Sequence, residues 1–98
     1  MTELKNFLDQ EGRLTAFPAK RRMKLLALFY LAGKFDAEKT YTEKEVNELL
    51  NRWHTFGDPA TLRRELFTHR FIDRERSGKS YWLEPAPPSL EDLMNKYS

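Results

Sequence analysis

The chain has 98 residues, 40% of them hydrophobic and 33% charged, which is the size and composition of one folded domain. It contains no cysteine, which excludes disulfides, thiolate metal ligands and cysteine nucleophiles. The formal net charge is only +2, so charge alone permits a nucleic-acid partner without demanding one.

Residues 1–17 are expected to form an N-terminal extension that contains a short helix. Over residues 2–10, Leu4, Phe7 and Leu8 share one helical face, and Thr2 is a suitable N-cap. These apolar side chains either cover the next helix or form part of a homodimer interface. The chain opens with mixed charge and has no apolar run of membrane-spanning length, so we expect a cytoplasmic protein without a membrane partner.

A long first helix is predicted over residues 19–34, with Pro18 in its first turn. Its start is basic, whereas residues 25–31 are apolar almost all round the helix. A helix with one side exposed to solvent would carry apolar residues only in a stripe along its other side. This helix is therefore covered on two sides, either as the central helix of the domain or as half of a dimer interface.

A second helix begins at a capping box formed by Thr42 and Glu45, directly after a short β-prone stretch at residues 39–42. The inward face of this helix carries apolar side chains at helical spacing, namely Val46, Leu49, Leu50 and Trp53.

A third helix is predicted over residues 59–69, with Asp58 as N-cap and Pro59 in the first helical position. Leu62 and Leu66 are its inward pair. Only four residues separate it from the second helix, which predicts a tight helix-turn-helix corner.

Two strand-like runs, residues 71–74 and 79–83, flank Ser77 and Gly78 and predict a β-hairpin. Three prolines then open the tail at residues 84–98, where Ser89 caps a last short helix. The apolar side chains of that helix are Leu90, Leu93 and Met94.

This order of elements predicts an α+β, mostly α, winged helix-turn-helix fold for one domain over residues 1–98, with a core at 18–83. The hairpin at residues 71–83 is the wing, and the short strand before Thr42 pairs with it. The alternative is a three-helix bundle with a stray hairpin, which gives that short strand no role.

Several runs of residues also resemble a known prokaryotic family. They are Gly12-Arg13-Leu14-Thr15, Phe17-Pro18-Ala19-Lys20, Tyr41-Thr42-Glu43-Lys44-Glu45-Val46-Asn47, Asp58 with Leu62-Arg63-Arg64-Glu65-Leu66, and Tyr81-Trp82. The chain resembles the domain of unknown function 2087 family. The resemblance implies a domain found alone or behind the DNA-binding domain of bacterial transcription regulators, with no assigned activity and no established functional residues. A domain appended to a separate DNA reader can itself sense a ligand or bind a partner.

Positive charge is concentrated in two segments. Residues 19–34 carry five basic and no acidic side chains, and residues 59–82 carry six basic and three acidic ones. In a winged helix that binds DNA, the third helix enters the major groove and the wing contacts the backbone. The predicted nucleic-acid contacts are Thr61, Arg64 and Thr68 on the third helix, Arg74, Arg76 and Lys79 on the wing, and Lys20 and Arg21 on the first helix.

Two observations weigh against this interface. Asp58 and Glu65 bring negative charge beside the groove, since Glu65 is expected to face outward with Thr61, Arg64 and Thr68. Moreover, Arg63 or Arg64 has an alternative role in a structural ion pair with a nearby carboxylate. The alternative function is a protein-interaction or ligand-sensing module, with another regulatory protein as partner and no direct DNA binding.

No catalytic or metal-binding motif is found, so we expect neither an enzyme nor a cofactor. Glu43, Glu45 and Glu48 are read as capping and solvated side chains. The two histidines, His54 and His69, lack metal-ligand spacing and more plausibly complement helix ends. The aromatic residues, Trp53, Phe56, Tyr81 and Trp82, are interpreted as core and wing packing, with either Tyr81 or Trp82 exposed because they point to opposite faces of a strand.

Overall fold

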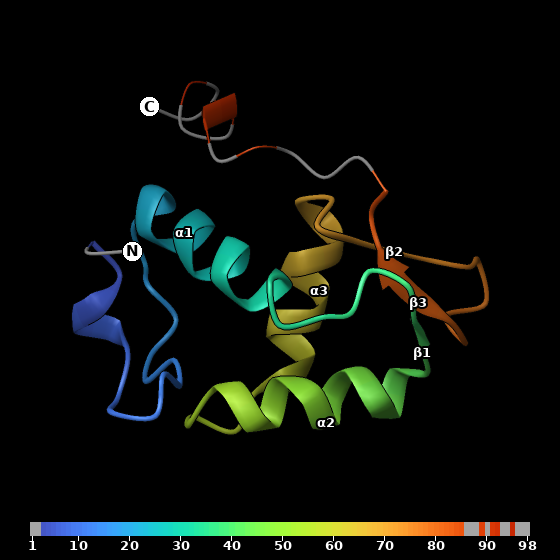
Figure 1. The fold of residues 1–98 in the computed structure, drawn as a ribbon, viewed down its shortest axis with the longest axis horizontal. Helices are drawn as coiled ribbons and strands as arrows, with labels where there is room; N and C mark the ends of the chain where they lie inside the picture. The colour runs from blue at the N-terminus through green and yellow to red at the C-terminus, as the bar shows by residue number, and fades with distance from the viewer. Residues whose placement is uncertain (1–2, 86–88, 90, 93–94, 96–98) are drawn as a thin grey trace.

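The computed structural model describes residues 3–85, 89, 91–92 and 95. They form an α+β domain in which three helices pack with one three-stranded antiparallel sheet (Figure 1). In chain order the elements are the 3₁₀ helix η1 (Lys5–Phe7), α1 (Arg21–Ala32), β1 (Thr40–Tyr41), α2 (Glu43–Trp53), α3 (Pro59–Thr68), β2 (Ile72–Arg74) and β3 (Tyr81–Leu83). The predicted α+β class is confirmed, and so is the predicted order of helices and strands between residues 18 and 83.

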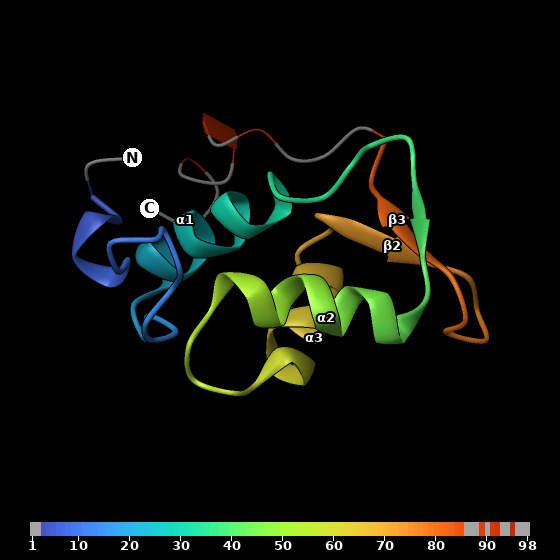
Figure 2. The same ribbon diagram turned by 60° about the horizontal axis from the view of Figure 1, so that its bottom comes forward.

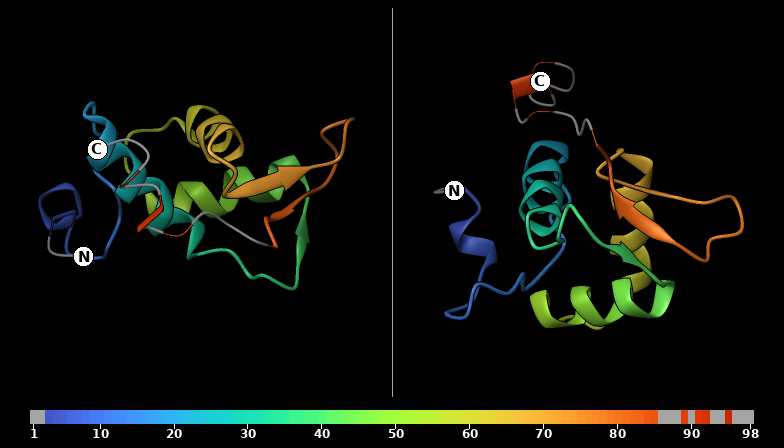
Figure 3. Two further views of the ribbon diagram at one scale, coloured as in Figure 1. Left: turned by 90° about the horizontal axis from the view of Figure 1, so that it is seen from above. Right: turned by 45° about the vertical axis from the view of Figure 1, so that its right-hand side comes forward.

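The sheet has the order β1-β3-β2, so the last strand lies in the middle. The short strand before α2 pairs with the hairpin as predicted, with Thr40 opposite Trp82 and Tyr41 opposite Tyr81. Gly78 takes the predicted positive φ of 77°, and its N–H donates to the carbonyl of Glu75 in the hairpin turn. Figure 3 shows this turn projecting away from the helices.

The predicted starts of α2 and α3 are confirmed. The N–H of Glu45 donates to the Thr42 hydroxyl at 3.1 Å, and the N–H of Thr42 donates to the Glu45 carboxylate at 2.9 Å. Asp58 accepts the N–H of Thr61 at 3.2 Å, and Pro59 is the first residue of α3. These caps orient two amphipathic helices whose predicted inward leucines and valine are all buried, while Trp53 is partly buried against the core.

Helix α1 is shorter than the predicted span of 19–34. Lys20 is its N-cap with extended backbone, so Pro18 lies before the helix instead of in its first turn. Pro18 is buried before the helix. No side chain caps the start of α1, so no capping interaction extends the helix toward Pro18. The helix is covered on more than one side, because all residues from 25 to 28 are buried. It is thus the central helix of the domain.

The predicted helix over residues 2–10 is wrong except for the single 3₁₀ turn, and its proposed cap, Thr2, lies outside the described residues. The Asp9 carboxylate accepts the N–H groups of Glu11 and Arg13, which closes a loop in competition with a continuing helix. After this loop the backbone of Leu14 forms isolated β-bridges with Leu8 and with His54. The segment covers α1, since the Tyr30 hydroxyl donates to the carbonyl of Gly12 at 2.6 Å.

The predicted C-terminal helix falls largely on residues that the structure does not describe. The Ser89 hydroxyl accepts the N–H of Asp92 at 3.0 Å, as its predicted capping role requires. Leu90, Leu93 and Met94 lie outside the described residues.

Candidate nucleic-acid interface

Six of the eight predicted contact residues lie on α3 and the hairpin, which adjoin each other (Figures 1 and 2). Arg64, Thr68 and the hairpin cations are exposed, whereas Thr61 is half-buried. The other two, Lys20 and Arg21, are exposed at the start of α1, which lies on the left of Figure 1, far from the hairpin turn on the right. The structure therefore brings together a six-residue set and leaves those two apart.

The adjacent arginines of α3 have different environments. Arg63 donates to the Asn47 side chain and lies 3.3 Å from the Glu43 carboxylate, so it joins α3 to the start of α2. Arg64 points outward and forms no hydrogen bond or ion pair within the part of the chain that the structure describes. The structural ion pair considered as an alternative role thus belongs to Arg63, and Arg64 remains available to a ligand.

Glu65 does not face outward with Arg64, and this expectation is wrong. Its carboxylate lies 3.7 Å from Lys24 Nζ on α1 and 3.5 Å from His69 Nε2. At 100° per residue, Glu65 lies on the flank of α3 that meets α1, which places its charge away from the outer face. The outer face of α3 is accordingly more positive than the sequence count implied.

The negative charge of Asp58 remains at the start of α3. Hydrogen bonds from Thr61 lower the pKa of this carboxyl, and the nearby charge of Arg64 contributes in the same direction. The carboxylate is therefore ionised at neutral pH and already engaged as the cap of α3. An anionic ligand is expected to approach nearer the middle of α3, where Arg64 lies.

The hairpin contributes one arginine that folds back onto α3. The guanidinium of Arg74 lies 4.9 Å from the centre of the Phe67 ring, within the range of a cation–π contact. Phe67 itself is 37% exposed, so its ring can be reached from solvent. Arg74 thus lies against α3, whereas Arg76 and Lys79 are exposed in the hairpin turn.

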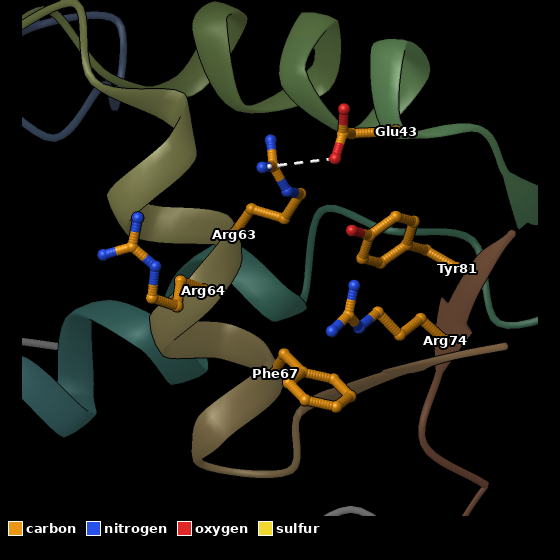
Figure 4. A pocket seen from close by; sticks show the side chains of 6 residues that line it. All are labelled: Glu43, Arg63, Arg64, Phe67, Arg74 and Tyr81. Atoms are coloured by element: carbon orange, nitrogen blue, oxygen red, sulfur yellow. Dashed lines mark ion pairs between the residues drawn. The ribbon is translucent and has the colours of Figure 1, made fainter. Parts of the chain in front are cut away.

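A hollow of about 150 Å³ lies between α3 and the hairpin (Figure 4). We call it the arginine hollow, and its lining residues are Glu43, Arg63, Arg64, Phe67, Arg74 and Tyr81. The Tyr81 ring is buried, and its hydroxyl points toward the space between Arg63 and Arg74 (Figure 4). Arg64 extends on the other side of α3 in this view.

The sequence does not predict this hollow, although it contains part of the signal. Phe67 follows Arg64 by three residues, so the two side chains are neighbours on the surface of one helix. The alternation of Tyr81 and Trp82 predicted that one of them is exposed, and the structure buries Tyr81 and leaves Trp82 partly exposed. The approach of Arg74 to Phe67 depends on how the hairpin docks on α3, which no local pattern encodes.

Residues 13–83 match a family model described as "Uncharacterized protein conserved in bacteria (DUF2087)". The chain belongs to this family. The matched DUF2087 segment runs from the loop before α1 to the end of β3 and includes every residue of the arginine hollow. No curated protein and no solved structure matches the chain.

The family description supplies no chemistry for the DUF2087 domain, so the site must be judged from its own residues. Within the described ranges, no group of three or more histidine, aspartate or glutamate side chains is arranged to hold a metal ion. No helix there is long and apolar enough to cross a membrane. The groups exposed on α3 and the hairpin are mainly hydrogen-bond donors and cations, and such groups suit an anionic ligand.

Proposed function

We propose that this chain is a winged helix domain that binds duplex DNA, with α3 in the major groove and the hairpin against the sugar-phosphate backbone. The element order and the pairing of β1 with β3 support the fold. So does the short connection between α2 and α3, which sets the two helices at a corner (Figure 2).

The observation that carries the proposal is the environment of Arg64. It lies at the centre of the outer face of α3, opposite the buried pair Leu62 and Leu66. The charged side chains on either side of it, Arg63 and Glu65, are held by α2 and α1. An arginine in this position can donate two parallel hydrogen bonds to guanine in the major groove.

Neighbouring groups extend the same surface. Thr68 lies one turn further along the outer face of α3 and can donate to a phosphate or a base. Arg76 and Lys79 are exposed on the hairpin turn, where they would reach the backbone beside the groove. The modest net charge of the domain agrees with weak or context-dependent binding more than with tight non-specific binding.

The test is binding of a fluorescent mixed-sequence duplex at low salt, repeated as salt is raised. We expect measurable binding that weakens steeply with salt, because cations displaced from the DNA are released on binding. Arg64→Ala should weaken the complex by about 1–3 kcal/mol, as loss of a base contact does. Arg52→Ala is the charge-matched control, since Arg52 is exposed on α2 instead of α3. No duplex binding at low salt would refute the proposal.

A protein-interaction function is the second candidate, and the exposed Phe67 favours it. Aromatic and arginine side chains that lie together are common at the centre of protein interfaces. Under this alternative Phe67→Ser abolishes binding of a regulatory partner, whereas duplex binding is absent in the wild type. The duplex titration therefore separates the two candidates.

A further inference from the structure

We propose that the arginine hollow binds a single phosphate group. The phosphate belongs either to the backbone of a bound duplex, in which case the inference rests on the function proposed above, or to a phosphorylated small molecule. Both sources present a tetrahedral phosphorus with anionic oxygens to the same side chains.

The donors that face the hollow come from three separate elements. Arg63 projects from α3, Arg74 from β2 and Tyr81 from β3, and the Tyr81 hydroxyl lies between the two guanidinium groups (Figure 4). Guanidinium groups bind phosphate through paired N–H donors, and a phenol adds a neutral O–H donor. Within the described residues, the Tyr81 hydroxyl makes no hydrogen bond, so its donor is available.

These donors are held in place before any ligand arrives. Asn47 and Glu43 hold the guanidinium of Arg63, and the Phe67 ring supports that of Arg74. Tyr81 is 3% exposed, so its ring is fixed by the core. Preorganised donors lose less conformational entropy on binding than mobile surface cations do.

The volume of the hollow limits the ligand to one anionic group. At about 150 Å³ it is smaller than the roughly 300–1,000 Å³ of sites that enclose a whole small molecule. The rest of the ligand, whether nucleic acid or small molecule, would remain outside.

Among the described residues that line the hollow, Glu43 is the one carboxylate, and it competes with the phosphate for Arg63. More than half of its side chain is exposed, so water can solvate the carboxylate when an anion displaces it. Glu43 therefore lowers the affinity for phosphate, which allows a gain-of-binding variant.

The experiment is titration of the ¹⁵N-labelled chain with inorganic phosphate, followed by NMR at the arginine side-chain and backbone signals of the hollow. Sodium chloride at matched ionic strength is the reference. We expect saturable shifts at Arg63, Arg74 and Tyr81 with phosphate only. Shifts that are absent, or equal in the two salts, would overturn the proposal.

Three variants test the assignment. Arg74→Gln and Tyr81→Phe should weaken phosphate binding several-fold, whereas Arg52→Gln, a control for lost charge, should not. Glu43→Gln should strengthen it several-fold, whereas Glu48→Gln, which removes an exposed charge elsewhere on α2, should not. The gain with Glu43→Gln cannot result from misfolding. Equal effects in each variant and its control would overturn the proposal.

Duplex titrations of the same variants identify the source of the phosphate. If the phosphate is part of a DNA backbone, Arg74→Gln lowers the slope of log affinity against log salt by about 1, relative to Arg52→Gln. If the slope is unchanged while the NMR response depends on Arg74, the ligand is a phosphorylated small molecule. Wild-type protein that binds phosphate but no duplex refutes the proposed DNA function and leaves the phosphate site standing.

Discussion

His54 joins the two helices of the corner through both nitrogens of its ring. Nδ1 lies 2.6 Å from the carbonyl oxygen of Leu50, and Nε2 accepts the N–H of Asp58 at 2.9 Å. The side chain is buried, and the pattern requires a neutral ring with its proton on Nδ1. One side chain therefore satisfies a carbonyl at the end of α2 and an amide at the start of α3.

Replacement of His54 by alanine should destabilise the domain by about 2–3 kcal/mol, because the buried carbonyl of Leu50 and the part-buried N–H of Asp58 lose their partner. Urea unfolding of His54→Ala measures this loss. Thr55→Ala is the control, since Thr55 is exposed and its own backbone bond to Leu14 is retained. Equal stability of the two variants would show that the corner does not depend on the imidazole.

The hairpin turn depends on Gly78 in a similar way. Its φ of 77° is in the region that favours glycine, and an added Cβ would lie 3.0 Å from Arg74 Nη1. Gly78→Ala should therefore cost about 1 kcal/mol and displace the Arg74 guanidinium from Phe67. Unfolding experiments test the energy, and the NMR signal of Arg74 Nε tests the displacement. Ser77→Ala, which keeps the φ at residue 78, should leave that signal in place.

Among the secondary-structure elements, α2 and α3 both begin at a side chain that caps exposed amides. Hydrogen bonds from Thr42 lower the pKa of Glu45, and hydrogen bonds from Thr61 lower that of Asp58. A carboxyl with a lowered pKa in the folded state stabilises the fold above its unfolded pKa. This stabilisation is lost as pH falls through the folded value.

The double variant Glu45→Gln, Asp58→Asn should therefore lose less stability on acidification than the wild type. Glutamine and asparagine still cap helices but do not titrate in this range. The free energy of unfolding of the wild type should decrease as pH falls from about 6 to below about 4, which is the ordinary pKa of a carboxyl group. Unfolding midpoints against pH measure both curves. Identical curves would place the acid sensitivity elsewhere, with Glu3 and Asp9 as the remaining carboxyls of lowered pKa.

These local signals explain which parts of the fold could be predicted. The capping box at Thr42 and the Asp58-Pro59 pair depend on neighbours within three residues, so the sequence alone locates both helix starts. The arginine hollow depends on the docking of Arg74 against Phe67 and of Arg63 against Asn47, which are contacts between distant segments. The orientation of Glu65 could not be predicted for the same reason, because its partner Lys24 belongs to another helix.

Across the chain as a whole, the buried core begins before the family match. The match starts at residue 13, yet Leu4 is as fully buried as Leu14. The N-terminal segment was predicted as a helix because its apolar spacing fits one. Its true structure is determined by pairing with the end of α2 through Leu14 and His54.

Leu4→Ala and Leu14→Ala should each destabilise the domain by about 2–5 kcal/mol, since each removes a fully buried leucine. Chemical unfolding with a two-state fit measures both losses. Ala16→Ser, at an exposed position of the same segment, should change stability by less than about 0.5 kcal/mol. If Leu4→Ala alone caused a negligible loss of stability, the stable unit would consist of the residues that match the family model.

The central place of β3 in the sheet has a consequence for how the domain acquires its structure. Both other strands pair only with β3 among the described strands, and β3 is the last of them to be synthesised. On the ribosome, β1 cannot pair until residues 81–83 emerge, so its amides remain exposed to water. The three helices can already associate at that stage. In the complete chain the pairing of Tyr41 with Tyr81 closes a loop of about 40 residues, so in refolding followed by pulsed hydrogen exchange the amides of α1 to α3 should acquire protection before those of β1.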